Sequence, residues 1–415
     1  MDFFKYNDAI SSLDVSAKEA LKDKFSFIEA VSDYNSQKVL SAFQKAGVSA
    51  SHLQGSDGYG YDDRGREMCD LVYSYAFGAE DALVRHNFVS GTHTLSVALS
   101  AVLRPGDRMV SAAGVPYDTM QEVIGITGKS GRGSLKDFGI IYDEVDLKEN
   151  GEVDIEAVAK KAAGAKMVYI QRSRGYALRP SLTIEKMEEI IKAVKKAEPK
   201  AIIMVDNCYG EFTETREPTE IGADLMAGSL IKNPGGSIAE TGGYIAGKKE
   251  LVELCADRLT VIGQGKEVGC TLNQTKKILQ GFFLAPKIVE GAVKTADYAA
   301  CIFEKAGYEC FPRYTDTRCD IVTSIKLGSR EKLISFCQGI QSSSPIDSFV
   351  LPEPWAMPGY SDEVIMAAGA FNLGSSIELS ADGPLREPYA VYMQGGVTFE
   401  TGRIGVLNAL KNLVD

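Results

Sequence analysis

The sequence predicts an α/β fold in which a large domain holds a mostly parallel sheet and a smaller α/β domain follows it. The chain has 415 residues, more than one ordinary hydrophobic core accommodates, so two domains are expected. Short apolar runs alternate with amphipathic stretches from about residue 80 to residue 247, which is typical of right-handed strand–helix–strand crossovers. A second, shorter alternation occupies residues 321–413. We therefore predict an N-terminal helical arm over residues 1–50, a large domain over residues 51–275 and a smaller domain over residues 276–415.

Composition and charge narrow the function classes. The chain is 45% hydrophobic and 24% charged, which is a globular balance. Its net charge of −11 argues against nucleic acid or an anionic membrane surface as the main partner. No apolar run approaches the roughly 18 residues of a membrane span, and the start of the chain lacks the pattern of a secretion signal. Eight cysteines without a CxxC pair indicate reduced thiols and a cytoplasmic location, and three histidines argue against a multi-histidine metal site.

The N-terminal arm has helical periodicity over residues 1–47, with mixed charge around an apolar stripe. It is too short to fold alone, so we expect it to pack on a domain or on a second subunit. A further amphipathic helix is expected over residues 68–77.

The loop between these helices, residues 55–66, is rich in glycine and carries Tyr59, Tyr61, Arg64 and Arg66. Phenols and guanidiniums this close together would bind a phosphate or a carboxylate. A plain surface turn is the alternative interpretation.

A turn with the residues of a phosphate site follows an expected strand at residues 80–85 and begins a helix expected over residues 95–103. Such a turn aims backbone N–H groups and the helix dipole at an anion. Gly91 lets the backbone approach closely, and Thr92 and Thr94 add hydroxyl donors. The same pattern also fits a helix N-cap that binds nothing.

Two nearby features are less specific. His93 is either a half-buried histidine with ordinary partners or a side chain that faces a bound ring. Residues 128–130 have the sequence Gly-Lys-Ser of a P-loop end, but Val123 stands where the first glycine is required, so we expect a surface loop.

Further elements complete the two domains. In the large domain we expect strands at residues 109–110, 139–145 and 167–171 and helices at residues 155–163, 184–197 and 249–259, with a long helix at residues 276–306 after it. The smaller domain is expected to hold strands at residues 321–325 and 364–371 and helices at residues 331–338 and 399–413. The strand at residues 167–171 ends in polar and cationic residues, at the edge where ligands of open α/β sheets bind.

The stretch from residue 201 to residue 247 carries the strongest chemical signal. An apolar, buried strand at residues 201–205 ends in Asp206, and Lys232 stands between short apolar residues and a Pro-Gly-Gly turn. An anion for a ring nitrogen and an amine for an aldehyde are the two protein groups that pyridoxal phosphate (PLP) needs. A capping aspartate and an ordinary loop lysine are the alternatives for each residue alone. Together with the turn at Gly91, the pair favours a PLP site.

Five motifs in this order resemble a known family. They are Gly58-Tyr59-Gly60-Tyr61-Asp62-Asp63, Ser90-Gly91-Thr92-His93, Gln171-Arg172-Ser173-Arg174-Gly175-Tyr176, Val205-Asp206-Asn207-Cys208-Tyr209-Gly210-Glu211-Phe212 and Ser229-Leu230-Ile231-Lys232-Asn233-Pro234-Gly235-Gly236. With these motifs the chain resembles the methionine gamma-lyase-like or "aluminum resistance" proteins, which are related to cystathionine beta-lyase and gamma-synthase. The resemblance covers nearly the whole chain. It implies the fold-type I fold of PLP-dependent transferases, with the large domain binding PLP.

The resemblance also implies roles for individual residues. The PLP aldehyde would be bonded to Lys232, and Asp206 would pair with the pyridine nitrogen. Phosphate contacts are implied for the amides of Gly91 and Thr92 and for Ser229.

Other contacts to the cofactor are expected from Tyr117, which would stack on the ring, and from His93 and Cys208. Tyr59 and Tyr61 would reach the phosphate of the neighbouring subunit. The active unit is therefore expected to be a homodimer or a homotetramer with shared sites.

The implied activity is PLP-dependent cleavage of a carbon–sulfur bond in a sulfur amino acid of the cystathionine or methionine type, giving keto acid, ammonia and thiol. Asp206 would keep the ring protonated through a charge-assisted bond of roughly 1.5–3 kcal/mol. Lys232 would be the base at the substrate α-carbon if burial and the cationic ring lower its pKa.

A substrate carboxylate favours a bidentate arginine. Arg386 is the first choice, and Arg174, Arg172 and Arg403 are further candidates. Because a fold does not fix a function, another PLP reaction such as transamination or racemisation, or PLP binding without lyase activity, stays open.

Overall fold

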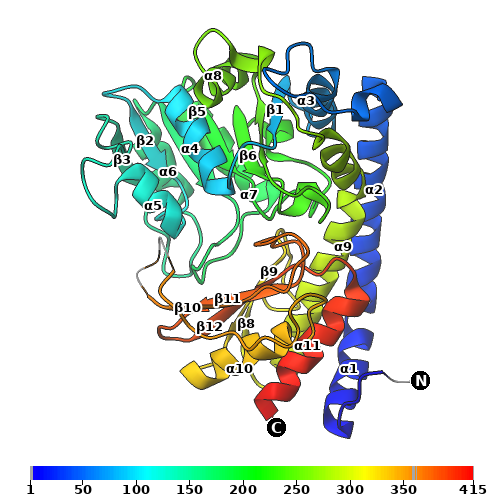
Figure 1. Cartoon of the computed structure of the whole chain (residues 1–415). Helices are drawn as coiled ribbons and strands as arrows, with labels where there is room; N and C mark the ends of the chain where they lie inside the picture. Colours follow the sequence, from blue (N-terminus) through cyan, green and yellow to red (C-terminus); the bar gives the residue numbers. More distant parts are fainter. Residues whose placement is uncertain (1–2, 358–359, 361, 415) are drawn as a thin grey trace.

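The computed structural model describes residues 3–357, 360 and 362–414. It confirms the predicted α/β fold with a large, mostly parallel sheet. Figure 1 shows this sheet and its helices at one end of the molecule and a smaller sheet at the other, with two long helices running beside both.

Helices make up most of the regular structure. They are α1 (Asp8–Ala20), α2 (Lys22–Ala46), α3 (Arg64–Ala76), α4 (Gly91–Val102), α5 (Asp118–Ile124), α6 (Ile155–Ala162), α7 (Ile184–Ala197), α8 (Lys249–Leu259), α9 (Thr275–Lys305), α10 (Arg330–Gln341) and α11 (Phe399–Val414). Within the described residues, none of these helices combines the length and the apolar character that crossing a membrane requires.

The large sheet has its strands in the order β1-β7-β6-β5-β4-β2-β3. They are β1 (Asp81–Arg85), β2 (Arg108–Ser111), β3 (Ile141–Glu144), β4 (Met167–Gln171), β5 (Ile202–Asp206), β6 (Leu225–Ser229) and β7 (Gly243–Gly247). β7 runs antiparallel to its neighbours β1 and β6, and the pairs among the other strands are parallel. The register places Gln171 beside Asp206 and Asp206 beside Ala227, so the carboxyl ends of β4, β5 and β6 share one edge.

Helices cover both faces of this sheet, which is why its central strands are apolar without interruption. Successive side chains of a strand point to opposite faces. Accordingly, Val168 and Ile170 of β4 belong to the core formed with α6 and α7, whereas Met167 and Tyr169 belong to the core formed with α4 and α8.

The smaller sheet is antiparallel throughout, in the order β10-β11-β12-β9-β8. Its strands are β8 (Glu309–Phe311), β9 (Val322–Lys326), β10 (Val364–Ala367), β11 (Ser380–Pro384) and β12 (Ala390–Gln394). The sequence predicted β9 and β10 but not the other three strands. β11 reads Ser-Ala-Asp-Gly-Pro, which has no β-branched or aromatic residue, so its strand pairing is set by tertiary context.

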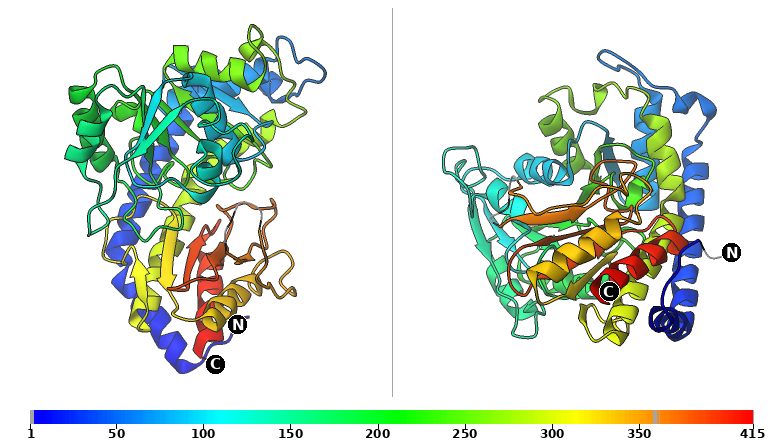
Figure 2. Two further views of the ribbon diagram at one scale, coloured as in Figure 1. Left: turned by 90° about the vertical axis from the view of Figure 1, so that its left-hand side faces the viewer. Right: turned by 60° about the horizontal axis from the view of Figure 1, so that its bottom comes forward.

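The N-terminal arm packs on its own chain. Figure 2 shows α2 beside α9, and α1 lies against α9 and α11 at the end with the small sheet. Ile28 and Val39 of α2 belong to the core around the large sheet, and Ile10 and Ala17 of α1 belong to the core around the small sheet. α9 begins next to the predicted domain boundary at residue 275, and the division into domains stays a prediction.

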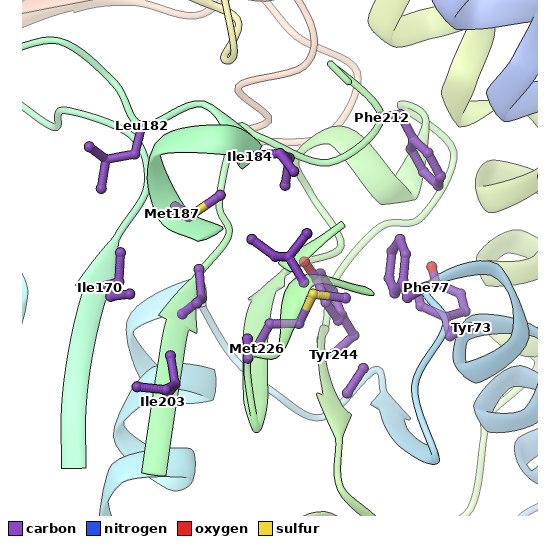
Figure 3. Close-up of a cluster of buried hydrophobic side chains, with 14 of the residues drawn as sticks. Tyr73, Phe77, Ile170, Leu182, Ile184, Met187, Ile203, Phe212, Met226 and Tyr244 are labelled. Atoms are coloured by element: carbon purple, nitrogen blue, oxygen red, sulfur yellow. The ribbon is translucent and has the colours of Figure 1, made fainter. Parts of the chain in front are cut away.

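An aromatic cluster supports the loop that follows β5. Figure 3 shows Tyr73, Phe77, Phe212 and Tyr244 among the buried side chains on this face of the sheet. The ring centroids of Phe77 and Tyr244 are 5.2 Å apart. The Tyr244 hydroxyl donates a hydrogen bond of 2.7 Å to Glu211, so the core is linked directly to the loop that carries the site.

Candidate active site

A pocket lies between the two sheets, at the carboxyl edge of the large one. Its walls come from the ends of β4 and β5, the start of α4, the loop after β6, and the strands β9, β11 and β12. The structure brings six of the predicted site residues to this pocket, namely Gly91, Thr92, Tyr117, Asp206, Cys208 and Lys232.

Asp206 is the last residue of β5 and is buried. The Tyr169 hydroxyl donates to its Oδ2 over 3.2 Å, and the Cys208 backbone N–H donates to its Oδ1 over 3.1 Å. Burial raises the pKa of this carboxyl, and the nearby Lys232 ammonium opposes that rise. A carboxylate held in this way can accept a further hydrogen bond from a protonated ring nitrogen.

Lys232 follows β6 on a tight turn that requires a glycine three residues later. A Cβ atom on Gly235 would lie 1.6 Å from the Leu230 carbonyl oxygen, so the backbone there requires glycine. The Asn233 side chain fixes the turn by donating to the Glu211 carbonyl oxygen over 2.9 Å. The Lys232 Nζ lies 4.0 Å from the centroid of the Tyr209 ring.

The surroundings of Lys232 act on the pKa of its amine in two directions. Burial by itself lowers the pKa of this amine, but Cys208 and Tyr209, once ionised, together with Asp206 outweigh burial and raise the pKa above its usual range. The expected lowering depends on the cationic ring as well as on burial, and it stays a prediction. A lysine in this setting needs a positive charge close by, such as a protonated cofactor ring, before it releases its proton readily.

The start of α4 forms a site for an anion. A Cβ atom on Gly91 would lie 3.4 Å from the Ser229 Cβ and 3.9 Å from the Lys232 Nζ, so the glycine keeps this approach open. Ser90 caps the helix by accepting from the His93 backbone N–H over 3.0 Å. Among the described residues, the buried Ser229 hydroxyl has no hydrogen-bond partner, which is costly unless a ligand supplies one. A phosphate at this helix start would satisfy the hydroxyl and the free N–H groups together.

Tyr117 stands at the other side of the pocket. Its backbone N–H donates to Gln171 Oε1 over 2.7 Å, and its hydroxyl pairs with the Tyr360 hydroxyl at 2.6 Å. The groups around the pocket therefore fit PLP. They are a carboxylate for the ring nitrogen, an amine for the aldehyde, an aromatic side chain to stack on the ring and an anion site for the phosphate.

Other predicted residues lie outside this pocket. The His93 ring accepts from the Val89 backbone N–H over 3.2 Å, and Ser229 lies just behind the pocket wall. Tyr59 and Tyr61 are 70% and 62% exposed and stack on each other with ring centroids 5.5 Å apart. Their expected role at a neighbouring subunit stays a prediction.

The arginines predicted for the substrate carboxylate do not line the pocket in the described part of the chain. Arg386 is half exposed and pairs with Asp362 at 2.8 Å. Arg174 is buried with its Nε 4.0 Å from Asp320, and this Nε has no hydrogen-bond partner among the described residues.

The two further candidates also make contacts elsewhere. Arg172 pairs with Glu214 at 2.6 Å, and Arg403 pairs with Asp14 at 2.8 Å. All four arginines fit by residue type, but a sequence does not show which way a long side chain points.

Several pocket residues were not predicted. Tyr209 lines the pocket with a left-handed backbone, φ 72°, which is uncommon for a residue other than glycine and often marks a functional site. Asp382, Tyr392 and Gln394 come from the small sheet. The run of Asp206, Asn207, Cys208 and Tyr209 after a buried strand could have pointed to Tyr209, but no pattern in β11 or β12 singles out the others.

Comparison with known proteins shows which family the chain belongs to. The family model described as methionine gamma-lyase matches residues 10–414, nearly the whole chain. This chain belongs to the methionine gamma-lyase family. Members of this family use PLP, so the protein is a PLP-dependent enzyme of the carbon–sulfur lyase group, and the resemblance of its motifs is confirmed.

Several solved structures are similar to this methionine gamma-lyase family member, and two of them come from bacteria of different genera. One is a carbon-sulfur lyase involved in aluminum resistance from Clostridium novyi NT, with 50% identity, a TM-score of 0.94, and coverage of 98% of this chain and 96% of that chain. Another, from Listeria monocytogenes, is named a "putative cystathionine beta-lyase involved in aluminum resistance"; it has 49% identity, a TM-score of 0.95, and coverage of 97% and 100%.

Among curated proteins, the "Uncharacterized protein YnbB" of Bacillus subtilis (strain 168) is 48% identical over 388 residues, 93% of this chain and 92% of that protein. The PLP-dependent protein YhfS from Escherichia coli has a TM-score of 0.63 at 14% identity and covers 92% of this chain and 97% of that chain. At that identity the likeness concerns the fold, and the expected fold-type I architecture is confirmed.

Proposed function

We propose that this protein cleaves a carbon–sulfur bond in a sulfur-containing amino acid, with Lys232 as the residue that carries PLP and moves the proton. One observation carries the assignment of the residues: a buried carboxylate and a lysine amine line one pocket beside a helix start, and an unpartnered serine hydroxyl lies just behind its wall. The Clostridium novyi relative, named a carbon-sulfur lyase, supports the same reaction class.

The predicted site residues have separate tasks in this proposal. Gly91 and Ser229 bind the phosphate, and Asp206 holds a proton on the ring nitrogen. When bound, PLP supplies an electron sink for the pair that the substrate α-carbon releases. Lys232 would hold the cofactor by its aldehyde before substrate enters, and its amine would then take the proton from the substrate α-carbon. Tyr117 covers the ring and keeps water out.

The bonds balance with water as the other reactant. The carbon–sulfur bond breaks, the thiol leaves with a proton, and water releases the remaining carbon skeleton as keto acid and ammonia. Both the cystathionine type and the methionine type of substrate fit this scheme. Arg174 and Arg386 are the proposed partners of the substrate carboxylate, since Arg174 lies buried near the pocket and the charge of Arg386 acts on the pocket residue Tyr392.

The function can be tested by covalent labelling together with a substrate panel. Borohydride reduction of the purified protein should fix a pyridoxyl group on the peptide that contains Lys232, and mass spectrometry should find it there. The same preparation should form keto acid and thiol from at least one sulfur amino acid. A label on another lysine would contradict the assignment of Lys232. Keto acid without thiol would favour the alternative, another PLP reaction such as transamination.

We further propose that the active unit is a homodimer or homotetramer with shared sites. Tyr59 and Tyr61 are exposed and do not line the pocket of their own chain. On α2, Phe27 and Tyr34 are 67% and 51% exposed. Exposed aromatic groups of this kind are typical of an interface. A cytoplasmic location is proposed as well, and the eight free cysteines support it.

Mixing inactive chains tests the shared site. Lys232→Ala chains lack the amine, and Tyr59→Ala/Tyr61→Ala chains lack the two tyrosine rings that would complete the partner's site. We expect hybrid dimers to contain one intact site, so that an equal mixture recovers about a quarter of the wild-type rate after random exchange. Native mass spectrometry would verify exchange. Hybrids that form without any recovered rate would contradict the shared site.

A further inference from the structure

A buried carboxylate lies on the wall of the pocket that the small sheet provides. Asp382, in β11, is 7% exposed and lines the pocket that Asp206 and Lys232 line from the large sheet. The Tyr176 hydroxyl donates to its Oδ2, and Gln394 Nε2 donates to its Oδ1 over 2.9 Å. Both oxygens therefore accept hydrogen bonds, which is the pattern of an ionised carboxylate.

This carboxylate lacks a cation of its own. Among the described residues Asp382 has no ion-pair partner, and burial raises its pKa while the Lys232 ammonium lowers it. In the proposed function the Lys232 amine is bound to the aldehyde before substrate enters and faces the substrate α-carbon afterwards, so in neither state is it a close partner for Asp382. A buried carboxylate held by two neutral donors is costly unless a cation approaches it. The pocket is the side from which a cation can come.

Tyrosine rings surround the same part of the pocket. Tyr176 and Tyr392 have ring centroids 4.9 Å apart, and Tyr117 and Tyr176 have centroids 5.7 Å apart. The Tyr392 hydroxyl donates to the Tyr176 carbonyl oxygen over 2.6 Å, which holds the two rings together. The faces of aromatic rings attract cations, and a carboxylate among them strengthens that preference.

The geometry points to a subsite for a second ammonium group: the substrate is an amino acid whose sulfur substituent ends in an ammonium, bound by Asp382 and the tyrosines. This inference rests on the proposed function, which brings the α-amino group of the substrate to PLP. Because the α-amino group is bound at the cofactor, the cation at Asp382 has to come from the far end of the substrate side chain. A methyl thioether would leave Asp382 without a partner.

Two thioethers of equal length test this selectivity. S-(2-aminoethyl)-L-cysteine ends in an ammonium, and S-propyl-L-cysteine ends in a methyl group at the same position. We expect the wild-type kcat/KM to be at least ~100-fold higher for the aminoethyl compound, because a site built for a polar group rejects an analogue that lacks it. In Asp382→Asn this ratio should fall at least ~10-fold, because the aminoethyl compound loses more of its kcat/KM than the propyl compound does.

Two further variants separate recognition from folding. Asp382→Glu keeps the charge and should retain part of the preference. Glu378→Gln is a matched control, since Glu378 is also buried just before β11 but accepts from the backbone N–H groups of Phe371 and Asn372 and does not line the pocket. Its selectivity ratio should equal that of the wild type. A ratio that falls equally in Glu378→Gln would overturn the role of Asp382.

A binding measurement keeps the inference independent of turnover. Calorimetry on the PLP-loaded protein should give L-lysine at least ~10-fold tighter binding than L-norleucine, which is lysine without its terminal ammonium, and Asp382→Asn should remove this advantage. Equal affinities in the wild type overturn the inference, even if thioethers are cleaved. A lysine preference that depends on Asp382 supports the cation subsite, even if no thioether is cleaved and the lyase proposal fails.

Discussion

Replacing Lys232 by alanine is expected to lower the rate of keto acid formation by at least ~10³-fold, because the variant loses both the amine that binds the aldehyde and the base at the α-carbon. The anion site at Gly91 and Ser229 stays intact, so PLP should still bind, but without a covalent bond. Borohydride should then fix no pyridoxyl group on the chain, and gel filtration should remove the cofactor. Rates from coupled keto acid assays and the cofactor absorbance before and after filtration measure both effects.

A lysine on the surface provides the control for this variant. Lys129 lies in the exposed loop whose Gly-Lys-Ser sequence resembles the end of a P-loop. Lys129→Ala should keep the wild-type rate and the covalent label. Turnover near the wild-type rate in Lys232→Ala, in a preparation with normal circular dichroism, would contradict the central role of Lys232.

The elements that the sequence predicted best are those whose local pattern and tertiary setting agree. The strand Met167–Gln171 and the helix Ile184–Ala197 have the predicted bounds. The strand is an uninterrupted apolar run in the middle of a covered sheet, and Thr183 caps the helix by accepting from the Lys186 N–H over 3.1 Å. In such segments periodicity, capping and burial all favour the same structure.

The rest of the site depends on contacts between distant parts of the chain. Asp382 meets Tyr176 across 206 positions of sequence, and β11 has no strand pattern of its own. Arg386 was an acceptable candidate by type, yet its direction is set by Asp362. The sign of the pKa shift at Lys232 also required the structure, because Cys208 and Asp206 act on the amine through space and not through sequence neighbours.

Asp206→Asn is the second variant with a large expected effect. A neutral amide cannot hold a proton on the ring nitrogen, so the electron sink weakens, and we expect kcat to fall roughly 10- to 100-fold, the equivalent of a charge-assisted bond of about 1.5–3 kcal/mol. Steady-state assays with the best substrate of the panel measure this loss. Tyr169→Phe is the matched control, because it removes the hydroxyl that donates to Asp206 Oδ2 over 3.2 Å but leaves the charge. Its rate should fall much less than that of Asp206→Asn, and equal losses would mean that packing, not charge, explains the effect.

Asp206→Asn should lose activity but should not lose stability when the protein is free of cofactor. Burial raises the pKa of Asp206 in the folded chain, so its ionised form is less favourable there than in the unfolded chain, whose carboxyl titrates near the usual value of about 4. Above that pH the carboxylate costs stability, and below it both states are protonated and the cost disappears. Thermal unfolding should therefore give Asp206→Asn a Tm equal to or above that of the wild type at pH 7, with the difference closing as the pH falls toward about 4. With PLP bound the order should reverse, because Asp206 then has a cationic partner. A lower Tm for the cofactor-free variant at pH 7 would show that Asp206 is held by its own protein contacts and not reserved for the ring nitrogen.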